Sequence, residues 1–541
     1  MKRASFRKHT KSTVVVAATL LVVAVWTIAN MSLHAQMPPR PTDRGTTQPP
    51  GGSDPLFAAW KQLPSRQAND TELTFLDDND IAWAARWRLL ESARERLDIS
   101  YFILSEDIFG TAFLGHLYHK AQQGVEIRVL LDAWGTKMSR DLRGNDYLDT
   151  LVNTEKVDVK MFRPMLSRLL DAFLTLDPIA IVASEHDKLL LADGKRGLTG
   201  GRSIATEYFA DPKLAPEAFR DADVLLTGEQ VEKAMVAAFD VQFNSGVAET
   251  VTLDVVDIHD SRQDLELTYQ AMDAWLHGRE IPDAVTKGME ERELPYLAEL
   301  RKHPNLKGIL KRSLPPSLTA PVRLLDSRTR LLEGDDEISN SMIMLARSAQ
   351  ESIFIQTPYL VLPKEAATAL TEAAQRGVRI TILVNGPTSS KSATSQAVFL
   401  EQWPLLLAKA PGLRLFVAAE RHSQHAKVIT IDGRLTLVGT YNLDPLSMAI
   451  NSELMVAVWS EAFVDRVLRK PRHMIDQGQP KVVRYRIKRD EQGKPVYDEE
   501  GAPVVAYGPL QHSDPSEWPE VERWGYVARS LIALPWIDPM F

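Results

Sequence analysis

The feature that most constrains this fold is an internal repeat of alternating helical and strand patterns. The first copy reads helix, strand, helix and strand at residues 83–97, 98–104, 110–124 and 125–132, and the second reads the same at 339–350, 351–361, 364–377 and 378–385. Gly124 and Gly377 end the second helix of each copy, where a left-handed cap suits glycine. This alternation predicts an α/β fold in which helices cover a mostly parallel or mixed sheet in each half.

The repeat also predicts two similar lobes that form a pseudo-dimer. A chain of 541 residues is longer than one hydrophobic core usually organises. Two amphipathic helical patterns between the lobes have no counterpart elsewhere, and we interpret them as an insertion or connector. The predicted segments are a basic flank with an anchor, a Pro/Gly-rich linker, the first lobe, the helical insertion, the second lobe, and a C-terminal hairpin with an apolar tail: 1–36, 37–60, 61–250, 251–320, 321–470 and 471–541. The tail fits packing on a lobe or contact with lipid.

A spaced triplet of residues occurs once in each copy of the repeat. The pattern is H-x-K-x(4)-D, and its members are His186, Lys188 and Asp193 in the first copy and His425, Lys427 and Asp432 in the second. Each triplet is followed by a glycine-led turn, which contains Ser203 in the first copy and Asn442 in the second. Two copies with identical spacing on strand-like runs are hard to explain by packing, so we interpret them as functional.

The paired triplets suit attack on a phosphodiester, which needs a nucleophile, an acid for the leaving oxygen and cations around the phosphoryl oxygens. One histidine can form a covalent phosphohistidine while the other protonates the leaving group and then deprotonates the incoming alcohol. Lys188 and Lys427 would neutralise the phosphoryl oxygens. Asp193 and Asp432 would orient the histidines through their second ring nitrogens. The hydroxyl and amide of the two turn residues are candidates to bind the phosphate.

Composition argues against other classes of site and partner. We expect no metal, because each triplet places a lysine between its histidine and aspartate, and no cofactor. The chain has no cysteine, which removes thiolate ligands and nucleophiles. A net charge of -8 and a pI near 5.9 provide no basic field for nucleic acid, so no nucleic-acid partner is expected.

The N-terminal segment predicts a membrane location. Basic residues precede an uncharged run at 12–33, which as a helix would span about 33 Å, close to one bilayer core. We interpret this run as an uncleaved single-pass helix with its basic flank in the cytoplasm. A cleaved signal peptide is the alternative, although Leu33 stands where a small residue is usual before a cleavage site at Ala35. Either interpretation puts the catalytic portion on the periplasmic side of a bacterial inner membrane.

These residues resemble the phospholipase D superfamily, which carries the histidine, lysine and aspartate pattern twice, and within it the membrane-anchored bacterial cardiolipin synthases. The likeness covers most of residues 65–470 and includes GGRSIATEYF at 200–209, FRDADVLLTG at 219–228, TPYLVLP at 357–363 and GTYNLDPLSMAINSE at 439–453. The resemblance implies two α/β lobes with one active site between them and metal-independent phosphatidyl transfer. It also implies His186 as nucleophile, His425 as general acid and base, and Glu453 as a supporting carboxylate.

Three positions depart from the pattern of the resemblance. Ser203 stands where the superfamily usually has Asn, and Leu446 stands where the synthases usually have Arg. Loss of that Arg would remove a bidentate contact to a headgroup phosphate. Glu185 precedes the first histidine, where a neutral or basic residue is more usual, and its position leaves open whether it pairs with a lysine or faces outward.

The sequence therefore predicts a phosphatidyltransferase of the cardiolipin synthase type, with membrane phospholipids as substrates and the bilayer as partner. The alternative is a phospholipase D that passes the same intermediate to water and releases phosphatidic acid. The two activities share every catalytic residue and differ in whether the acceptor site excludes water. A nuclease is disfavoured by the acidic, tethered and duplicated chain, and an inactive scaffold is disfavoured because both triplets are intact.

Overall fold

The computed structural model describes most of the chain between residues 48 and 518. The described ranges are 48–49, 51–63, 69–136, 147–164, 167–168, 182–251, 261–292, 294–329, 332, 337–478, 481–514 and 518. The predicted anchor at 12–33, much of the predicted linker and the apolar tail at 524–541 lie outside these ranges. Within them, no helix has both the length and the apolar character that crossing a bilayer requires.

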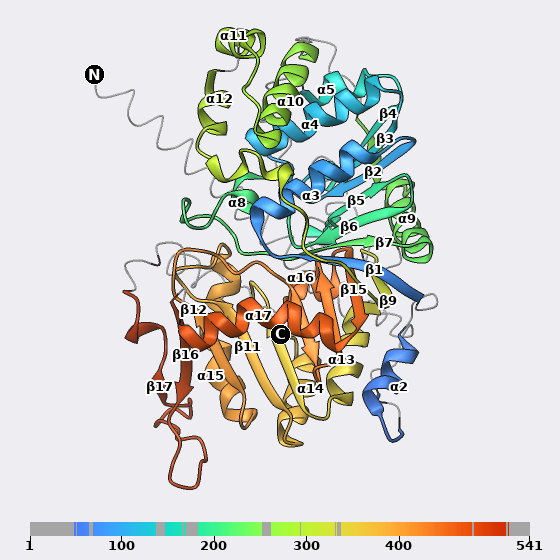
Figure 1. The fold of residues 1–541 in the computed structure, drawn as a ribbon. Helices are drawn as coiled ribbons and strands as arrows, with labels where there is room; N and C mark the ends of the chain where they lie inside the picture. The colour runs from blue at the N-terminus through green and yellow to red at the C-terminus, as the bar shows by residue number, and fades with distance from the viewer. Residues whose placement is uncertain are drawn as a thin grey trace, which may run out of the picture.

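One mixed sheet runs through the whole molecule (Figure 1). Its first half, residues 69–251, contains β1 (Asn69–Leu76), β2 (Arg96–Tyr101), β3 (Glu126–Asp132), β4 (Val157–Phe162), β5 (Leu189–Ala192), β6 (Arg196–Gly200), β7 (Asp223–Thr227) and β8 (Ala248–Thr250). Their spatial order is β8-β4-β3-β2-β5-β6-β7-β1. The neighbours β2, β3 and β4 run parallel, and the other neighbouring pairs run antiparallel.

The second half of the sheet, residues 318–507, repeats this order. It contains β9 (Leu318–Ser327), β10 (Ser352–Gln356), β11 (Arg379–Asn385), β12 (Arg414–Ala418), β13 (Val428–Ile431), β14 (Leu435–Gly439), β15 (Glu453–Trp459), β16 (Val482–Ile487) and β17 (Val505–Tyr507). From β9 outward the order is β15, β14, β13, β10, β11, β12, β16 and β17. The sequence repeat is therefore a repeat of strand order, with β10, β11 and β12 as the parallel set.

The two halves join where β1 pairs antiparallel with β9, and this joint lies at mid-height in Figure 1. A buried apolar cluster spans the joint and draws Leu73 and Val224 from the first half and Val322 and Val456 from the second. Burying apolar surface across the joint stabilises the pairing of the halves, because that surface would be wet if the halves separated.

Helices cover the sheet in both halves. The helices that precede β9 in the chain are α2 (Pro55–Gln62), α3 (Asn79–Ser92), α4 (Ile108–Gln122), α5 (Tyr147–Val152), α8 (Thr206–Phe209), α9 (Glu229–Phe243), α10 (Arg262–His277), α11 (Asp283–Arg292) and α12 (Leu294–Leu300). Of these, α2 packs with the core of the second half. The helices that follow β9 are α13 (Glu337–Ser348), α14 (Lys364–Gln375), α15 (Ala393–Lys409), α16 (Pro445–Ala449) and α17 (Glu461–Gln477). The helices predicted in each repeat correspond to α3, α4, α13 and α14, which confirms the α/β pattern.

The glycine caps of the repeat were predicted correctly, but several boundaries were wrong, among them that of the strand predicted at 351–361, which as β10 already ends at Gln356. Gly124 and Gly377 have φ of 87° and 92°, as the predicted left-handed caps require. The first predicted helix, 83–97, ends earlier at Ser92, and β2 already begins at Arg96. The chain turns there because the Asp193 carboxylate binds the backbone N–H groups that follow the helix.

Residues 262–300 form three helices that pack over the first half (Figure 1). The second predicted pattern, 290–303, is divided between the end of α11 and α12. Pro295 is the second residue of α12, where its missing N–H leaves no hydrogen bond unmade. α10 crosses α4 closely at Gly115, where a Cβ atom would lie 2.4 Å from the carbonyl oxygen of Leu265.

We predict that Gly115→Ala destabilises the protein by about 2 kcal/mol, because the added methyl group overpacks the contact between α4 and α10. Alanine is the better helix former, so a loss of stability would report the contact rather than helix propensity. The measurement is the midpoint of thermal unfolding, together with amide hydrogen exchange in α10.

Gly246→Ala is the control for this prediction, because a Cβ atom at Gly246 meets nothing within 4 Å. Equal midpoints for the two variants would contradict the close packing of α10 on α4.

Candidate active site

The histidine and lysine of each triplet lie at equivalent positions of the two half-sheets. His186 and Lys188 directly precede β5, and His425 and Lys427 directly precede β13. β5 and β13 occupy the same place in the repeated strand order. The Lys427 charge contributes to the pKa of His186, and the Lys188 charge contributes to that of His425, so the two histidine–lysine pairs belong to one electrostatic site.

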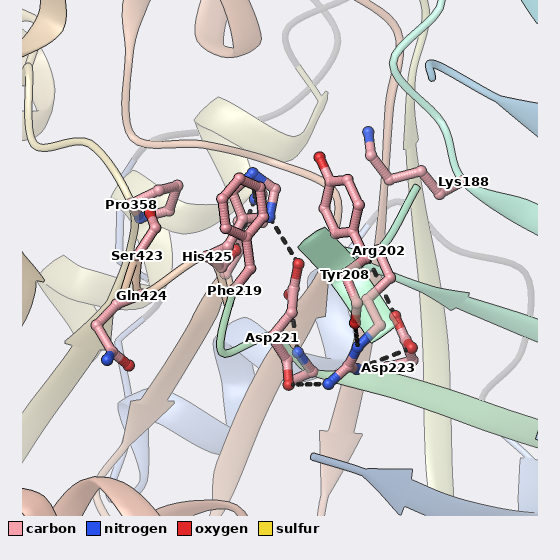
Figure 2. A network of polar contacts seen from close by, with 12 residues as sticks. Lys188, Arg202, Tyr208, Phe219, Asp221, Asp223, Pro358, Ser423, Gln424 and His425 are labelled. Carbon is pink, nitrogen blue, oxygen red and sulfur yellow. Dashed lines mark hydrogen bonds and ion pairs between the residues drawn. The ribbon is translucent and has the colours of Figure 1, made fainter. Parts of the chain in front are cut away.

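Each histidine is held by a carboxylate from the opposite half. His186 Nδ1 lies 2.8 Å from Glu453 Oε1, and His425 Nδ1 lies 2.6 Å from Asp221 Oδ2. Figure 2 shows the second of these pairs. A carboxylate acceptor assigns the proton to Nδ1 and leaves Nε2 of each ring free for chemistry. The site therefore exists only while the two halves are paired.

The predicted role of Asp193 and Asp432 as histidine partners is wrong. Their carboxylates instead accept backbone N–H groups at 2.8–3.0 Å, those of Arg94, Glu95 and Arg96 for Asp193 and those of Gln350, Glu351 and Ser352 for Asp432. Both aspartates have positive φ, 54° and 50°, in the turns after β5 and β13. They fix the chain at the starts of β2 and β10. Each aspartate lies at the opposite end of β5 or β13 from its histidine.

Asp221 is a functional residue that the sequence reasoning missed. It lies in the stretch 219–228 that carried the resemblance, and it is the first-half counterpart of Glu453. The distance from the glycine-led turn differs between the halves, 200–221 in the first and 439–453 in the second, so the repeat does not align the two carboxylates. An acidic residue in each half after the turn was the available signal.

The two carboxylates differ in charge state. Burial raises the pKa of Glu453 to about 7, against the opposing charge of Lys188 and hydrogen bonds from Ser447 and Thr440. Burial acts on Asp221 in the same direction, but its hydrogen bond with His425 and the charges of Lys427 and Arg202 outweigh burial and hold the pKa of Asp221 below its usual value. Asp221 is therefore ionised at neutral pH, whereas Glu453 is partly protonated.

Both lysines are buried beside the histidines. Lys188 Nζ donates to the carbonyl oxygen of His186 at 2.6 Å, and Lys427 Nζ donates to that of His425 at 2.6 Å and lies 3.1 Å from His425 Nε2. Among the described residues, neither lysine has an acidic side chain within 4.0 Å. Burial and the charge of Lys188 lower the pKa of Lys427 to about 7, despite the carboxylate of Asp221. Two buried amines without ion pairs are suited to an anion between them.

The imidazoles are neutral at physiological pH. Burial lowers the pKa of His186 well below its usual value, and the charges of Lys188 and Lys427 act in the same direction. Burial and Lys427 lower the pKa of His425 to about 4, although Asp221 opposes the shift. A neutral ring can attack phosphorus or accept a proton through Nε2.

Aromatic rings fix the two imidazole planes. Phe219 stacks on His425 with centroids 5.0 Å apart and planes 22° apart, and Tyr208 meets the same ring edge-on at 5.3 Å. Phe102 meets His186 edge-on at 4.7 Å. The stacked ring and Asp221 approach His425 from different sides in Figure 2, so the imidazole has little freedom to rotate.

A buried arginine supports the loop that carries Asp221. Arg202 donates to the carbonyl oxygens of Tyr208 and Asp221 at 3.3 and 2.7 Å and pairs with Asp223 at 2.9 Å. Arg86 binds the same Asp223 oxygen at 2.8 Å. Figure 2 shows Arg202 bridging the residues on either side of the loop. The network fixes the backbone from which the Asp221 carboxylate reaches His425.

The predicted phosphate ligands of the glycine-led turns are buried and available. The Ser203 hydroxyl and the Asn442 Oδ1 atom form no hydrogen bond within the described residues. Glu185 neither pairs with a lysine in that part of the chain nor faces outward: it is fully buried and accepts a hydrogen bond from Ser100 at 2.8 Å. Burial and the neighbouring Asp187 raise the pKa of Glu185 well above its usual value. Leu446 is 42% exposed.

One cluster outside the site has the composition of a metal site. Glu91, Asp273 and His277 place ligand atoms within 4.8 Å of one another on α3 and α10. Arg279 already forms an ion pair with Asp273, and a guanidinium beside the carboxylate opposes a second cation there. The ion pairs of the cluster are instead those of Asp273 with His277 and Arg279 at the end of α10.

Comparisons with known proteins agree on the family and the fold. The family model described as "Cardiolipin synthase, PLD-like domain" matches residues 87–240 and 342–475. Cardiolipin synthase C of Escherichia coli is 26% identical in sequence, and the match covers 76% of this chain and 86% of that protein. Cardiolipin synthase 1 of Bacillus cereus is 25% identical, and the match covers 74% of this chain and 66% of that protein. The crystal structure of phosphatidylserine synthase from Haemophilus influenzae has the same fold, with a TM-score of 0.58 at 12% identity, covering 90% of this chain and 99% of that one.

We predict that Asp432→Ala and Asp221→Ala have different consequences. Asp432→Ala removes the acceptor of three backbone N–H groups, so it should lower the free energy of unfolding by about 3 kcal/mol. Asp221→Ala leaves His425 without its acceptor, so turnover should fall by about 10²- to 10⁴-fold. Thermal midpoints and turnover per folded protein separate the two effects; a loss of turnover as large in Asp432→Ala would restore its catalytic role.

We also predict a pH-dependent gain of stability in Glu453→Gln. The pKa of Glu453 is about 7 in the folded protein and 4.5 as a reference, so the folded state binds the proton more tightly. Its contribution to stability is therefore full below pH 4.5 and is lost as the pH rises to 7. Glutamine does not ionise, so the variant should gain up to about 3 kcal/mol relative to the parent between pH 4.5 and pH 8.

Melting temperatures across this pH range test the Glu453 prediction, with Glu499→Gln at an exposed position as the control. A stability difference that does not change with pH would show that Glu453 ionises normally in the folded protein.

Proposed function

The chain belongs to the family of phospholipase D-like domains described as cardiolipin synthase, and from this premise we propose that it transfers a phosphatidyl group from one phospholipid to a hydroxyl group of another. The reaction type is phosphatidyl transfer of the cardiolipin synthase type, as the names of its relatives indicate for those proteins. The predicted donor and acceptor are phosphatidylglycerol-type lipids, and the product is then cardiolipin.

The observation that carries this proposal is the pair of neutral histidines flanked by two buried lysines. Lys188 and Lys427 lack an acidic partner within 4.0 Å in the described structure, and a phosphodiester bound between them would supply the missing negative charge. The Ser203 hydroxyl, which has no hydrogen-bond partner in the described structure, and the Nδ2 group of Asn442 then donate to phosphoryl oxygens. No other charged group is required to neutralise the phosphate.

The reaction proceeds in two displacements at phosphorus. In the first, Nε2 of His186 attacks, a bond from nitrogen to phosphorus forms, and the bond from phosphorus to the headgroup oxygen breaks. For this step His425 must take up a proton at Nε2 when the substrate binds, which the negative charges of the phosphodiester and of Asp221 favour; it then gives that proton to the headgroup oxygen, which leaves as an alcohol. In the second, His425 takes the proton of the acceptor hydroxyl, whose oxygen attacks phosphorus and releases His186. After the two steps His186 is again free and His425 again carries the proton with which it began the first step.

The unequal carboxylates support this order of roles. Asp221 is ionised, so it stabilises the positive charge that His425 carries when it acts as an acid. Glu453 has a pKa of about 7, so it orients His186 while adding less negative charge to it. His186 is thereby favoured as the neutral nucleophile and His425 as the acid and base.

We further infer that residues 61–250 and 321–470 are two lobes of a pseudo-dimer, joined through the helical segment 251–320. The repeated strand order supports this division, as do the two hydrogen bonds in which a histidine of one lobe contacts a carboxylate of the other. We also infer that the uncharged run at 12–33 anchors the chain in the cytoplasmic membrane with the catalytic portion outside. The five basic residues that precede the run support that orientation.

The test is incubation of the full-length protein in lipid vesicles with phosphatidylglycerol labelled in its glycerol headgroup and acyl chains. We expect labelled cardiolipin and free glycerol in equal amounts, and we expect both to persist in a chelator. His186→Asn and His425→Asn should each reduce the rate by at least about 10³-fold. His473→Asn, an exposed histidine on α17, is the matched control and should keep the parent rate.

Other outcomes of this experiment discriminate the alternatives. Phosphatidic acid as the sole lipid product would assign hydrolysis, the activity of a phospholipase D. Substantial turnover in either histidine variant would contradict the two-histidine mechanism, and a strict requirement for a divalent metal would contradict the role given to the lysines.

A further inference from the structure

We propose that the side chains of Trp134 and Leu446 form a docking rim through which the enzyme holds the mouth of its active site against a lipid bilayer. The inference rests on the proposed function, because it concerns how a membrane phospholipid reaches His186. It adds a partner surface that the catalytic residues themselves do not contain. The two members of the docking rim come from opposite halves of the molecule.

Trp134 is exposed although its backbone is fixed next to His186. The N–H groups of Trp134 and Gly135 each donate to Asp132 Oδ1 at 2.9 Å, and Asp132 Oδ2 accepts the N–H of Glu185 at 2.9 Å. Gly135 lies so close to Phe102 that a Cβ atom at Gly135 would be 2.2 Å from the carbonyl oxygen of Phe102. The Trp134 side chain nevertheless is 47% exposed. A rigid turn therefore holds a large apolar ring in solvent, beside the residue that precedes the nucleophile.

Leu446 has the same relation to His186 from the other half. It belongs to α16, whose N-terminal Asp444 accepts the N–H of Ser447 at 3.0 Å. Ser447 Oγ donates to Glu453 Oε1 at 2.5 Å, and the same oxygen holds His186. Leu446 is 42% exposed, although its neighbours in the turn are buried. Two turns from opposite halves thus flank one catalytic histidine, and each presents an exposed apolar side chain.

A bilayer is the partner that fits this arrangement. A phospholipid with two acyl chains is costly to lift into water, and the cost grows with every methylene group exposed. Its phosphate can reach His186 at low cost only if the mouth of the site lies at the membrane surface. Tryptophan is favoured at the level of lipid headgroups and leucine gains from contact with acyl chains. The docking rim supplies one of each, from two turns that are linked by hydrogen bonds to the surroundings of His186.

Single-cysteine labelling of the full-length protein tests the docking rim directly. The chain has no cysteine, so Trp134→Cys, Leu446→Cys and Leu405→Cys each provide one site for an environment-sensitive fluorophore. Leu405 on α15 is the matched control, because it is 46% exposed. The labelled proteins are reconstituted in phosphatidylglycerol-containing vesicles, with and without lipids that carry a quenching doxyl group.

We expect doxyl lipids to quench the labels at 134 and 446 at least threefold more than the label at 405. Quenching at 134 and 446 no greater than at 405 would overturn the docking rim. This readout needs no turnover, so it separates the two proposals: quenching without cardiolipin formation would leave the docking rim intact and refute the proposed activity. Cardiolipin formation without selective quenching would do the reverse.

Kinetics with two forms of the substrate provide a second measurement. Trp134→Ser and Leu446→Ser should lose about tenfold more turnover on vesicles than on a short-chain phosphatidylglycerol dispersed below its micelle concentration, since each loses about one side chain of apolar burial. Leu405→Ser should lose equally little on both. Equal losses on the two substrates in the rim variants, in protein with parental melting temperature, would assign these side chains to the site itself and overturn membrane docking.

Discussion

The rest of this structure depends on two hydrogen bonds between the halves, in each of which a histidine of one half contacts a carboxylate of the other. Glu453 of the second half orients His186 of the first, and Asp221 of the first half orients His425 of the second. Neither half can therefore hold its own histidine in a reactive orientation. The pairing of β1 with β9, with the apolar cluster that covers it, is a requirement for chemistry as well as for stability. A duplicated fold has become one indivisible site.

Burial gives the site its electrostatic character. The lysines and histidines are nearly inaccessible to solvent, and this lowers the pKa of Lys427 to about 7 and that of His425 to about 4. Such charges are costly without a counter-ion, so the site favours a ligand that brings negative charge with it. Asp221 and Glu453 have unequal pKa values because Asp221 is bound by His425 and lies near the charges of Lys427 and Arg202, whereas desolvation is the largest influence on Glu453. Pseudo-symmetry of the backbone thus coexists with an asymmetry of charge around the two histidines.

Much of the fold followed from patterns that are local in the sequence. Periodicity located α3, α4, α13 and α14, and glycine predicted the left-handed caps at Gly124 and Gly377. The histidine and lysine of each triplet are two residues apart in the segment that leads into a strand, and each lysine contacts the backbone of its own histidine. The aspartates lie beyond a strand of four residues, where the chain has already turned away, so spacing alone could not assign their partners. They brace backbone N–H groups instead.

The sequence by itself determined which chemical groups this protein can use: two histidines and two lysines, which a repeat places at equivalent positions of the two halves. The tertiary structure alone decided which carboxylates complete them. His186 and Glu453 are separated by 267 positions and His425 and Asp221 by 204, and their contact arises only after β1 and β9 have aligned the half-sheets. A hydrogen bond depends on position and direction in space, and for residues so distant in the chain those are properties of the packed sheet rather than of the local sequence.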